Sequence, residues 1–212
     1  MSQVVVVVGG GAISPRAFDV IHPVATVIAA DSGLDHAVAS GLAPSRLVGD
    51  LDSVSAAGRM WAYAHGTVVD EYPAAKDLTD TELAIAAALQ VPGIDHLVVV
   101  GGVGDRLDHL LGTLLALGHP ALGGLAKVVA VIGDTEFDVV HSGHQVSIAV
   151  EPGQTFSLLA LHGPCRGVTL TGAEWELDGA DLSATEARGV SNTAKEETLI
   201  TVTAGVVTVV IP

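Results

Sequence analysis

A run of five valines at residues 4–8 constrains the fold more than any other feature of this chain. A continuous β-branched stretch without polar alternation is typical of a strand that is buried on both faces, as in a parallel sheet covered by helices. Glycines at residues 9–11 follow the run, and Ser14-Pro15 fits an N-cap with proline at the first helical position. The start of the chain therefore predicts a strand, a turn and a helix.

The same alternation continues through the first two thirds of the chain. Further strands are predicted at residues 26–30, 47–48, 67–69, 97–100 and 127–132, and helices at 31–40, 54–64, 79–90 and 106–117. Thr79 and Glu82 form a capping-box pattern at the start of one of these helices. Alternating strands and helices predict an α/β fold with an open, mostly parallel, Rossmann-like sheet and helices on both faces.

After about residue 137 the helical periodicity is replaced by short β-rich segments, which are separated by Gly, Pro and Asn. These segments are residues 146–150, 155–161, 168–170, 199–202 and 206–211. The pattern predicts a C-terminal antiparallel β-sandwich domain. We therefore expect two domains, at residues 1–138 and 139–212.

Composition excludes several classes of protein. The formal net charge is −15 with only nine Lys and Arg, and no basic stripe of the kind that nucleic-acid binders carry is visible. A single cysteine, Cys165, excludes an intramolecular disulfide and a Cys-based zinc site, and it suits the cytosol. The N-terminus lacks the basic region of a signal peptide, and its apolar run is too short to span a bilayer. We expect a cytoplasmic protein that binds neither nucleic acid nor membranes.

Three carboxylate clusters lie where predicted strands lead into helices. They contain Asp50 and Asp52, then Lys76, Asp77 and Asp80, then Asp105, Arg106, Asp108 and His109. In open α/β folds the loops after the carboxyl ends of strands face the ligand crevice. Acids gathered there with one Lys and one Arg indicate a site for Mg²⁺ and a polyphosphate.

The first cluster has two interpretations. On an extended segment Asp50 and Asp52 point to the same face, where their charges repel unless a cation lies between them. Mg²⁺ is a hard ion that takes one or two carboxylates together with phosphate oxygens. The alternative is that Asp52 or Ser53 caps the next helix.

The second cluster lies at a predicted helix N-terminus. Capping alone explains Thr79 and Asp80, because acids in a first turn complement the helix dipole. It does not explain Lys76, since a cation there is unfavourable without an anionic partner, which a phosphate would supply.

In the third cluster, a glycine-rich loop follows a strand and precedes a helix. Gly101, Gly102 and Gly104 would let backbone N–H groups approach a phosphate, and Arg106 is a forked donor for one. Asp108 and His109 are either a satisfied polar pair or a catalytic pair.

The order of the clusters resembles the thiamine pyrophosphokinase family. Members carry segments like D-G-G-x-x, G-D-x-D-S, K-D-x-T-D-x-E-L-A and G-G-x-G-x-R-x-D-H. In this chain the corresponding segments begin at Asp31, Gly49, Lys76 and Gly101. Towards the C-terminus the segments G-V-T-L-T-G, W-E-L and G-V-S-N begin at Gly167, Trp175 and Gly189. The resemblance covers nearly the whole chain.

The resemblance implies transfer of the β,γ-diphosphoryl group of ATP to the hydroxyethyl oxygen of thiamine, with release of AMP. It further implies Mg²⁺, a homodimer, and thiamine held between the α/β domain of one subunit and the sandwich of the other. Residues 1–138 would then bind ATP and Mg²⁺, and residues 139–212 thiamine.

The resemblance also suggests which residues do this work. The metal candidates are Asp50, Asp52 and Asp80, with Asp31 as a further one. The catalytic candidates are Asp52, Lys76, Asp80 and Asp108. The ATP-binding candidates are Asp31, Gly33, Asp77, Gly101, Gly102, Arg106 and Asp108. Either Asp80 or Asp108 could accept the proton of the thiamine hydroxyl.

Thiamine carries a cationic thiazolium and a flat pyrimidine, and an aromatic face attracts both, by roughly 0.5–2 kcal/mol for the cation–π part. Trp175 is the candidate, and the alternative is that it belongs to the sandwich core. Ser191 and Asn192 are candidates for hydrogen bonds to the pyrimidine, although Ser-Asn also favours a plain turn. His141 and His144 lack further ligand partners in the sequence, so no zinc site is expected.

Three departures from the family pattern stand out: Ser32 replaces a usual Gly, Leu51 a common Phe and Thr193 a frequent acid. Two other functions stay open, a related diphosphokinase that acts on a hydroxymethylpterin and a non-catalytic sensor of thiamine or nucleotide. Trp175 and the Ser191-Asn192 pair argue against the first, and the intact acid clusters argue against the second.

Overall fold

The computed structural model describes residues 2–212, which form two compact units. The first contains residues 2–116 and Ala130–Asp134, and the second contains Leu117–Val129 and Thr135–Pro212. The expected domain boundary between residues 138 and 139 stays a prediction. No helix within residues 2–212 is long and apolar enough to cross a membrane.

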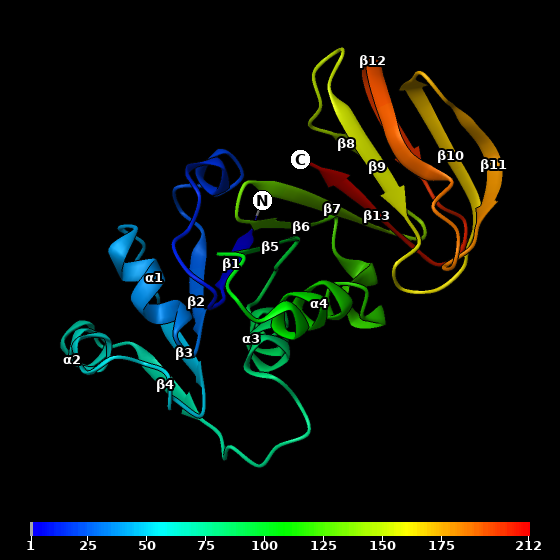
Figure 1. The fold of residues 1–212 in the computed structure, drawn as a ribbon. Helices are drawn as coiled ribbons and strands as arrows, with labels where there is room; N and C mark the ends of the chain where they lie inside the picture. Colours follow the sequence, from blue (N-terminus) through cyan, green and yellow to red (C-terminus); the bar gives the residue numbers. More distant parts are fainter. Residues whose placement is uncertain (1) are drawn as a thin grey trace. The chain divides into compact units, whose positions relative to one another are not determined.

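Five parallel strands form the sheet of the first unit (Figure 1). They are β1 (Gln3–Val7), β2 (Thr26–Ala30), β3 (Arg46–Gly49), β4 (Val68–Glu71) and β5 (His96–Gly101). β1 pairs with β5 on one side and with β2 on the other, and β3 and β4 follow outward from β2. The valines of β1 are completely buried, as the sequence predicts. Because the strand order reverses between β1 and β5, a ligand crevice is expected at the carboxyl ends of these two strands.

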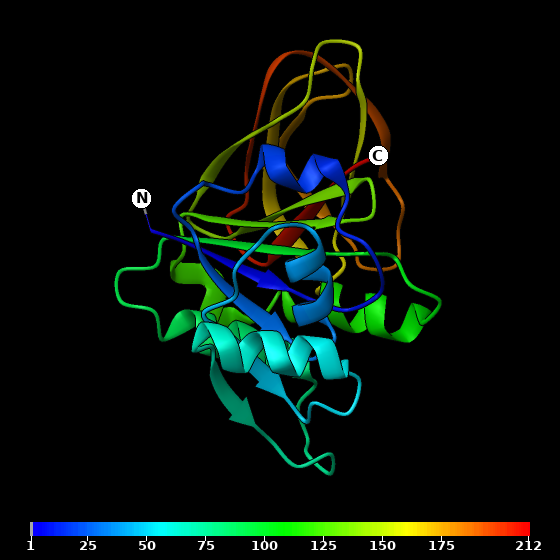
Figure 2. The ribbon, with the colours of Figure 1, turned by 90° about the vertical axis from the view of Figure 1, so that its left-hand side faces the viewer.

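Helices cover both faces of this sheet, which confirms the predicted fold class. They are α1 (Gly33–Ala39), α2 (Ala56–His65), α3 (Asp80–Leu89) and α4 (Leu107–Ala116). Figures 1 and 2 show α1 and α2 on one face and α3 on the other, where α3 packs across β1, β2 and β3. The helix predicted at Ser14-Pro15 is a short 3-10 turn, η1 (Pro15–Asp19).

Local chemistry determines where two of these helices begin. At the start of α3, the Thr79 hydroxyl accepts the Glu82 N–H and the Glu82 carboxylate accepts the Thr79 N–H, so the capping box is confirmed. At the start of α1, a Cβ on Gly33 would clash with the Val7 carbonyl oxygen. Gly33 therefore lets α1 lie close against β1, which gives this residue a packing role apart from the ATP contact predicted for it.

The second unit is built from antiparallel strands. They are β7 (Thr135–His141), β8 (Gln145–Ile148), β9 (Thr155–Leu159), β10 (Cys165–Ala173), β11 (Leu177–Leu182), β12 (Gly189–Thr201) and β13 (Val206–Ile211). A 3-10 turn, η2 (Pro120–Gly124), precedes β6 (Lys127–Ile132), whose last residues belong to the first unit.

The long strand β12 connects two sheets of this unit. The first part of β12 pairs with β9, β9 pairs with β13, and β13 pairs with β7. The second part of β12 pairs with β8 on one side and with β10 on the other, and β10 pairs with β11. A core that includes Phe156, Leu170 and Ile200 is buried between the strands. The predicted antiparallel C-terminal fold is confirmed.

Sequence patterns missed β7, β11 and the first half of β12. β11 alternates weakly, because Asp178, Gly179 and Asp181 interrupt its apolar residues. The first half of β12 is mostly polar, and its backbone pairing with β9 and β10 makes it a strand. This pairing joins residues that are far apart in the sequence, so the alternation of apolar and polar residues within one segment does not predict it.

Candidate functional site

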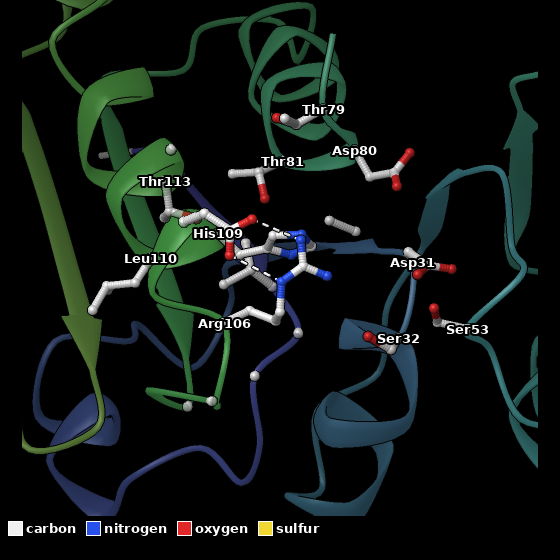
Figure 3. Close-up of a pocket in the computed structure, with 18 of the residues that line it drawn as sticks. Asp31, Ser32, Ser53, Thr79, Asp80, Thr81, Arg106, His109, Leu110 and Thr113 are labelled. Atoms are coloured by element: carbon white, nitrogen blue, oxygen red, sulfur yellow. Dashed lines mark hydrogen bonds and ion pairs between the residues drawn. The ribbon is translucent and has the colours of Figure 1, made fainter. Parts of the chain in front are cut away.

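A pocket of about 770 Å³ opens at the carboxyl ends of the parallel strands. Its lining comes from the loops after β1, β2, β3, β4 and β5, together with the start of α4 and the end of β6. Figure 3 shows Asp31, Ser32 and Ser53 on one side, Thr79, Asp80 and Thr81 on another, and Arg106 with His109 beside them. This volume lies within the range of small-molecule sites.

Three carboxylates converge beside this pocket. Asp31, Asp50 and Asp52 each present an oxygen atom, and these atoms lie within 4.8 Å of one another. Gly49 makes the arrangement possible: its φ of +148° favours glycine, and a Cβ there would lie 3.0 Å from Asp80 Oδ1 and 3.2 Å from the Asp31 Cβ. Asp31 and Asp80 therefore approach the end of β3 where residue 49 has no side chain.

The Oδ1 atom of Asp31 is buried and has no hydrogen-bond partner among residues 2–212. Burial raises the pKa of the Asp31 carboxyl, and the negative charges of Asp80 and Asp52 act in the same direction, although hydrogen bonds from Ser32 and Ser53 oppose the shift. A buried carboxylate oxygen without a partner is costly unless a cation compensates it. Asp31 is therefore a stronger ligand candidate than the sequence suggested.

Lys76 joins the first and second clusters. Its Nζ lies 3.2 Å from Asp50 Oδ2 and 3.1 Å from Asp80 Oδ1. Burial disfavours the charged ammonium, but the two carboxylates outweigh it and raise the pKa of Lys76. The pKa of Asp50 is lowered by the Asp52 N–H and by Lys76. The anionic partner that this lysine needs is thus supplied by carboxylates, and its contact with a phosphate stays a prediction.

Arg106 and Asp108 form a bidentate pair at the start of α4. Arg106 Nε donates to Asp108 Oδ1 at 2.9 Å and Nη2 donates to Oδ2 at 2.6 Å (Figure 3). The hydrogen bonds from Arg106 lower the pKa of Asp108 to about 2. Both side chains are exposed and Nη1 of Arg106 donates no bond to Asp108, so a phosphate can reach the guanidinium beside Asp108 or in its place. Asp108 therefore has Arg106 as its partner, and the polar or catalytic pairing with His109 stays a prediction.

The loops after β1 and β5 meet through their glycines. A Cβ on Gly102 would lie 2.6 Å from the Gly10 carbonyl oxygen, and Gly104 adopts a φ of +66°. Gly101 ends β5, and its carbonyl accepts the Gly133 N–H at 2.9 Å. Gly102 and Gly104 line the pocket with backbone, and Asp77, from the loop between β4 and α3, lines it as well. Such a loop allows a phosphate to approach peptide N–H groups.

Sequence patterns missed several contributors to the pocket, among them Thr113 and Ile132. Thr113 is a buried polar residue on α4, and Ile132 reaches the pocket from the end of β6. Thr113 lies within an apolar helical stretch, where a single hydroxyl carries no recognisable signal.

The thiamine candidates lie in the second unit: Trp175 is in the loop between β10 and β11, and Ser191 and Asn192 are on β12. Trp175 is 61% exposed, so the alternative that it belongs to the sandwich core is wrong. Ser191 is exposed and has a left-handed φ of +63°, and its N–H donates to Ser157 Oγ at 3.1 Å.

Asn192 is buried and holds the backbone of Trp175. Its Oδ1 accepts the N–H groups of Trp175 at 3.1 Å and Thr193 at 2.8 Å, and its Nδ2 donates to the Trp175 carbonyl at 2.8 Å. A hydrogen bond from Asn192 to a substrate stays a prediction. Its observed contacts place the loop that carries the indole.

Comparisons with known proteins agree with this geometry. The model of the thiamin pyrophosphokinase catalytic domain matches residues 19–124, and that of the thiamin pyrophosphokinase vitamin B1 binding domain matches residues 143–207. Thiamine pyrophosphokinase of Bacillus subtilis strain 168 is 24% identical over 165 residues, which cover 78% of this chain and 76% of the relative.

Solved structures show the same fold. A crystal structure of thiamine pyrophosphokinase from Bacillus subtilis has a TM-score of 0.80 and 22% identity, and covers 99% of this chain and 98% of its own. A thiamin pyrophosphokinase family protein from Enterococcus faecalis has a TM-score of 0.77 and 25% identity, with coverage of 100% and 98%. Thiamin pyrophosphokinase from Candida albicans has a TM-score of 0.76 at 14% identity, with coverage of 99% and 89%.

We expect Asn192→Ala to lower the free energy of unfolding by about 1–3 kcal/mol, because the backbone N–H and carbonyl of Trp175 lose the buried Asn192 side chain as their partner. Urea denaturation followed by circular dichroism measures this change. Ser191→Ala is the matched control, since it keeps the backbone N–H that bonds Ser157, and its effect should stay within about 0.5 kcal/mol. Equal losses for the two variants would contradict the role of Asn192.

Proposed function

Because the chain belongs to the thiamin pyrophosphokinase family, we propose that its acid-lined pocket holds ATP with Mg²⁺ for the reaction of that family. The chain is an enzyme of this type, which transfers the diphosphoryl group of ATP to the hydroxyl of thiamine and yields thiamine diphosphate and AMP. The observation that carries the site assignment is the convergence of Asp31, Asp50 and Asp52 beside a pocket of nucleotide size.

The donor set fits Mg²⁺. All three candidate groups are carboxylates, the ligands that a hard cation prefers, and the buried Asp31 Oδ1 has no other partner among the described residues. We assign Asp31, Asp50 and Asp52 to the metal and keep Asp80 as a further candidate. When bound, Mg²⁺ would neutralise phosphate charge and leave the chain to position the reactants.

Positive charge for the phosphates comes from two side chains. Lys76 is fixed between Asp50 and Asp80 and lines the pocket, so it can face a phosphate without a large movement. Arg106 would exchange the Asp108 carboxylate for phosphate oxygens, which suit the same forked geometry. The glycine loop after β5 would add backbone N–H groups.

The proton of the thiamine hydroxyl needs an acceptor. Asp108 is a weak base, because Arg106 lowers its pKa to about 2. Its carboxylate is also occupied by the bidentate pair with Arg106. We therefore favour Asp80, which lines the pocket and makes no such pair with an arginine of the described chain.

The thiamine site is proposed at Trp175, whose exposed indole is free to stack on a flat cationic ring. A homodimer with thiamine between subunits belongs to the same proposal. Its support is a stripe on α4: Leu107, Leu111 and Leu115 are 66%, 51% and 58% exposed at helical spacing. Exposed apolar stripes are typical of interfaces, and a twofold axis can pair one such stripe with its copy. A cytoplasmic location, where ATP is at hand, stays a prediction.

One assay tests the reaction and both alternatives. Purified protein is incubated with ATP, Mg²⁺ and thiamine, and AMP and thiamine diphosphate are measured by chromatography. Equimolar formation of the two products is the expected result. Turnover with a hydroxymethylpterin but not with thiamine would identify the related diphosphokinase, and binding of thiamine without any product would identify a sensor.

We expect Asp52→Asn to lower kcat by about 10²–10³-fold while the fold stays intact, because a charge that stabilises the reacting phosphates through the metal is lost. Steady-state assays and circular dichroism measure the two properties. Asp178→Asn makes the same charge change on an exposed position of β11 and should be neutral. Near-normal activity of Asp52→Asn would remove Asp52 from the metal site.

We expect Leu111→Glu to convert a dimer to a monomer, because it places a charge in the middle of the α4 stripe. Light scattering coupled to size exclusion measures the mass. Val24→Glu, at an exposed position outside the stripe, is the control and should leave the mass unchanged. A wild-type monomer, or a dimer that survives Leu111→Glu, would reject this interface.

A further inference from the structure

The loop that carries Asp50 and Asp52 has a strained backbone. Leu51 adopts a φ of +63°. This left-handed conformation is costly for a residue with a bulky side chain, whereas glycine adopts it readily. The turn brings the Asp52 N–H to Asp50 Oδ1 at 3.2 Å and leaves the Leu51 side chain buried. A conformation of this kind persists only where neighbouring groups hold it.

Arg59 of α2 holds this loop from one side. Its Nη2 donates to the Leu51 carbonyl, and its Nε donates to the Val54 carbonyl at 3.3 Å. One guanidinium therefore bonds both the strained residue and the residue three positions later. Because the donors are charged, these bonds are stronger than neutral ones.

Asp35 of α1 holds the end of the same loop. Its carboxylate accepts the Ser55 N–H at 2.9 Å and the Ser55 hydroxyl at 2.5 Å, and Ser55 Oγ in turn accepts the Gly58 N–H at 2.9 Å. A Cβ on Gly58 would clash with Asp35 Oδ1, so the glycine admits this contact at the first turn of α2.

We propose that Arg59 and Asp35 are positioning residues, which hold the loop from Gly49 to Ser55 so that Asp50 and Asp52 face Asp31. Neither is among the residues that line the pocket, so both would act through the loop and not through contact with a substrate. The inference rests on the metal site proposed above. It assigns α1 and α2, which lie together on one face of the sheet (Figure 1), a role in metal affinity.

The expected effect is on metal binding. Groups that orient metal ligands typically change metal affinity by about 10–100-fold when they are removed. Arg59→Met keeps the apolar stem of the side chain and removes every donor, so Leu51 loses the bond that holds its strained conformation. Arg59→Lys keeps one charged donor and should lie between Arg59→Met and the wild type.

The test measures Mn²⁺ binding to the full chain without nucleotide, by electron paramagnetic resonance of the free ion. We expect Arg59→Met to weaken Mn²⁺ about 10-fold or more, Arg59→Lys to recover part of this, and Asp35→Asn to weaken binding as well. Arg46→Met is the matched control, because Arg46 pairs with Asp70 between β3 and β4, away from this loop. Thermal unfolding confirms that each variant folds.

A second readout separates positioning from a general loss of structure. Arg59→Lys should raise the Mg²⁺ concentration needed for half-maximal activity while the KM for thiamine stays unchanged. If both Arg59 variants and Asp35→Asn bind Mn²⁺ with wild-type affinity, the positioning role is overturned, but the proposed metal site is not. Absence of Mn²⁺ binding by the wild type would overturn the proposed metal site, and the inference with it.

Discussion

Repulsion between carboxylates is the interaction on which this site depends. Asp31, Asp50 and Asp52 present oxygens within 4.8 Å of one another, and Asp80 lies at the same end of the sheet. Lys76 compensates part of this charge by contacting Asp50 and Asp80, but nothing among the described residues compensates the buried Asp31 Oδ1. This imbalance supports the proposed Mg²⁺ site, in which a cation would also face the phosphates of a nucleotide.

The backbone makes this convergence possible. Glycine at position 49 leaves space for acids from two other loops, and glycines 10, 102 and 104 let the loops after β1 and β5 approach at the point where the strand order reverses. Leu51 instead accepts a left-handed conformation with a full side chain, held by contacts from α1 and α2. The parallel sheet thus brings the acids to one end, and Arg59 and Asp35 from the helices on one face bond the loop that carries two of them.

Local patterns in the sequence were sufficient for most of the first unit and for the acid clusters. Residues 26–30 form the predicted strand, the capping box at Thr79 and Glu82 is present, and the clusters meet at one end of the sheet. The sequence could not reveal that Asp108 pairs with Arg106, that Lys76 contacts carboxylates, or that Asn192 bonds the backbone of Trp175. These contacts depend on rotamers and on distant pairing, such as the register of β12 against β10, which local composition does not encode.

The negative net charge of the chain has opposite effects on the approach of its two substrates. With a formal net charge of −15, the protein disfavours the approach of ATP, and the proposed Mg²⁺ site with Lys76 and Arg106 would offset this repulsion. Thiamine is a cation, and the same negative field favours its approach, while Trp175 offers a neutral aromatic face on which it can stack. In the proposed site, metal would therefore affect the anionic substrate much more strongly than the cationic one. Residues that orient Asp50 and Asp52 would then act on the binding of ATP, whereas the loop that Asn192 holds would act on the binding of thiamine.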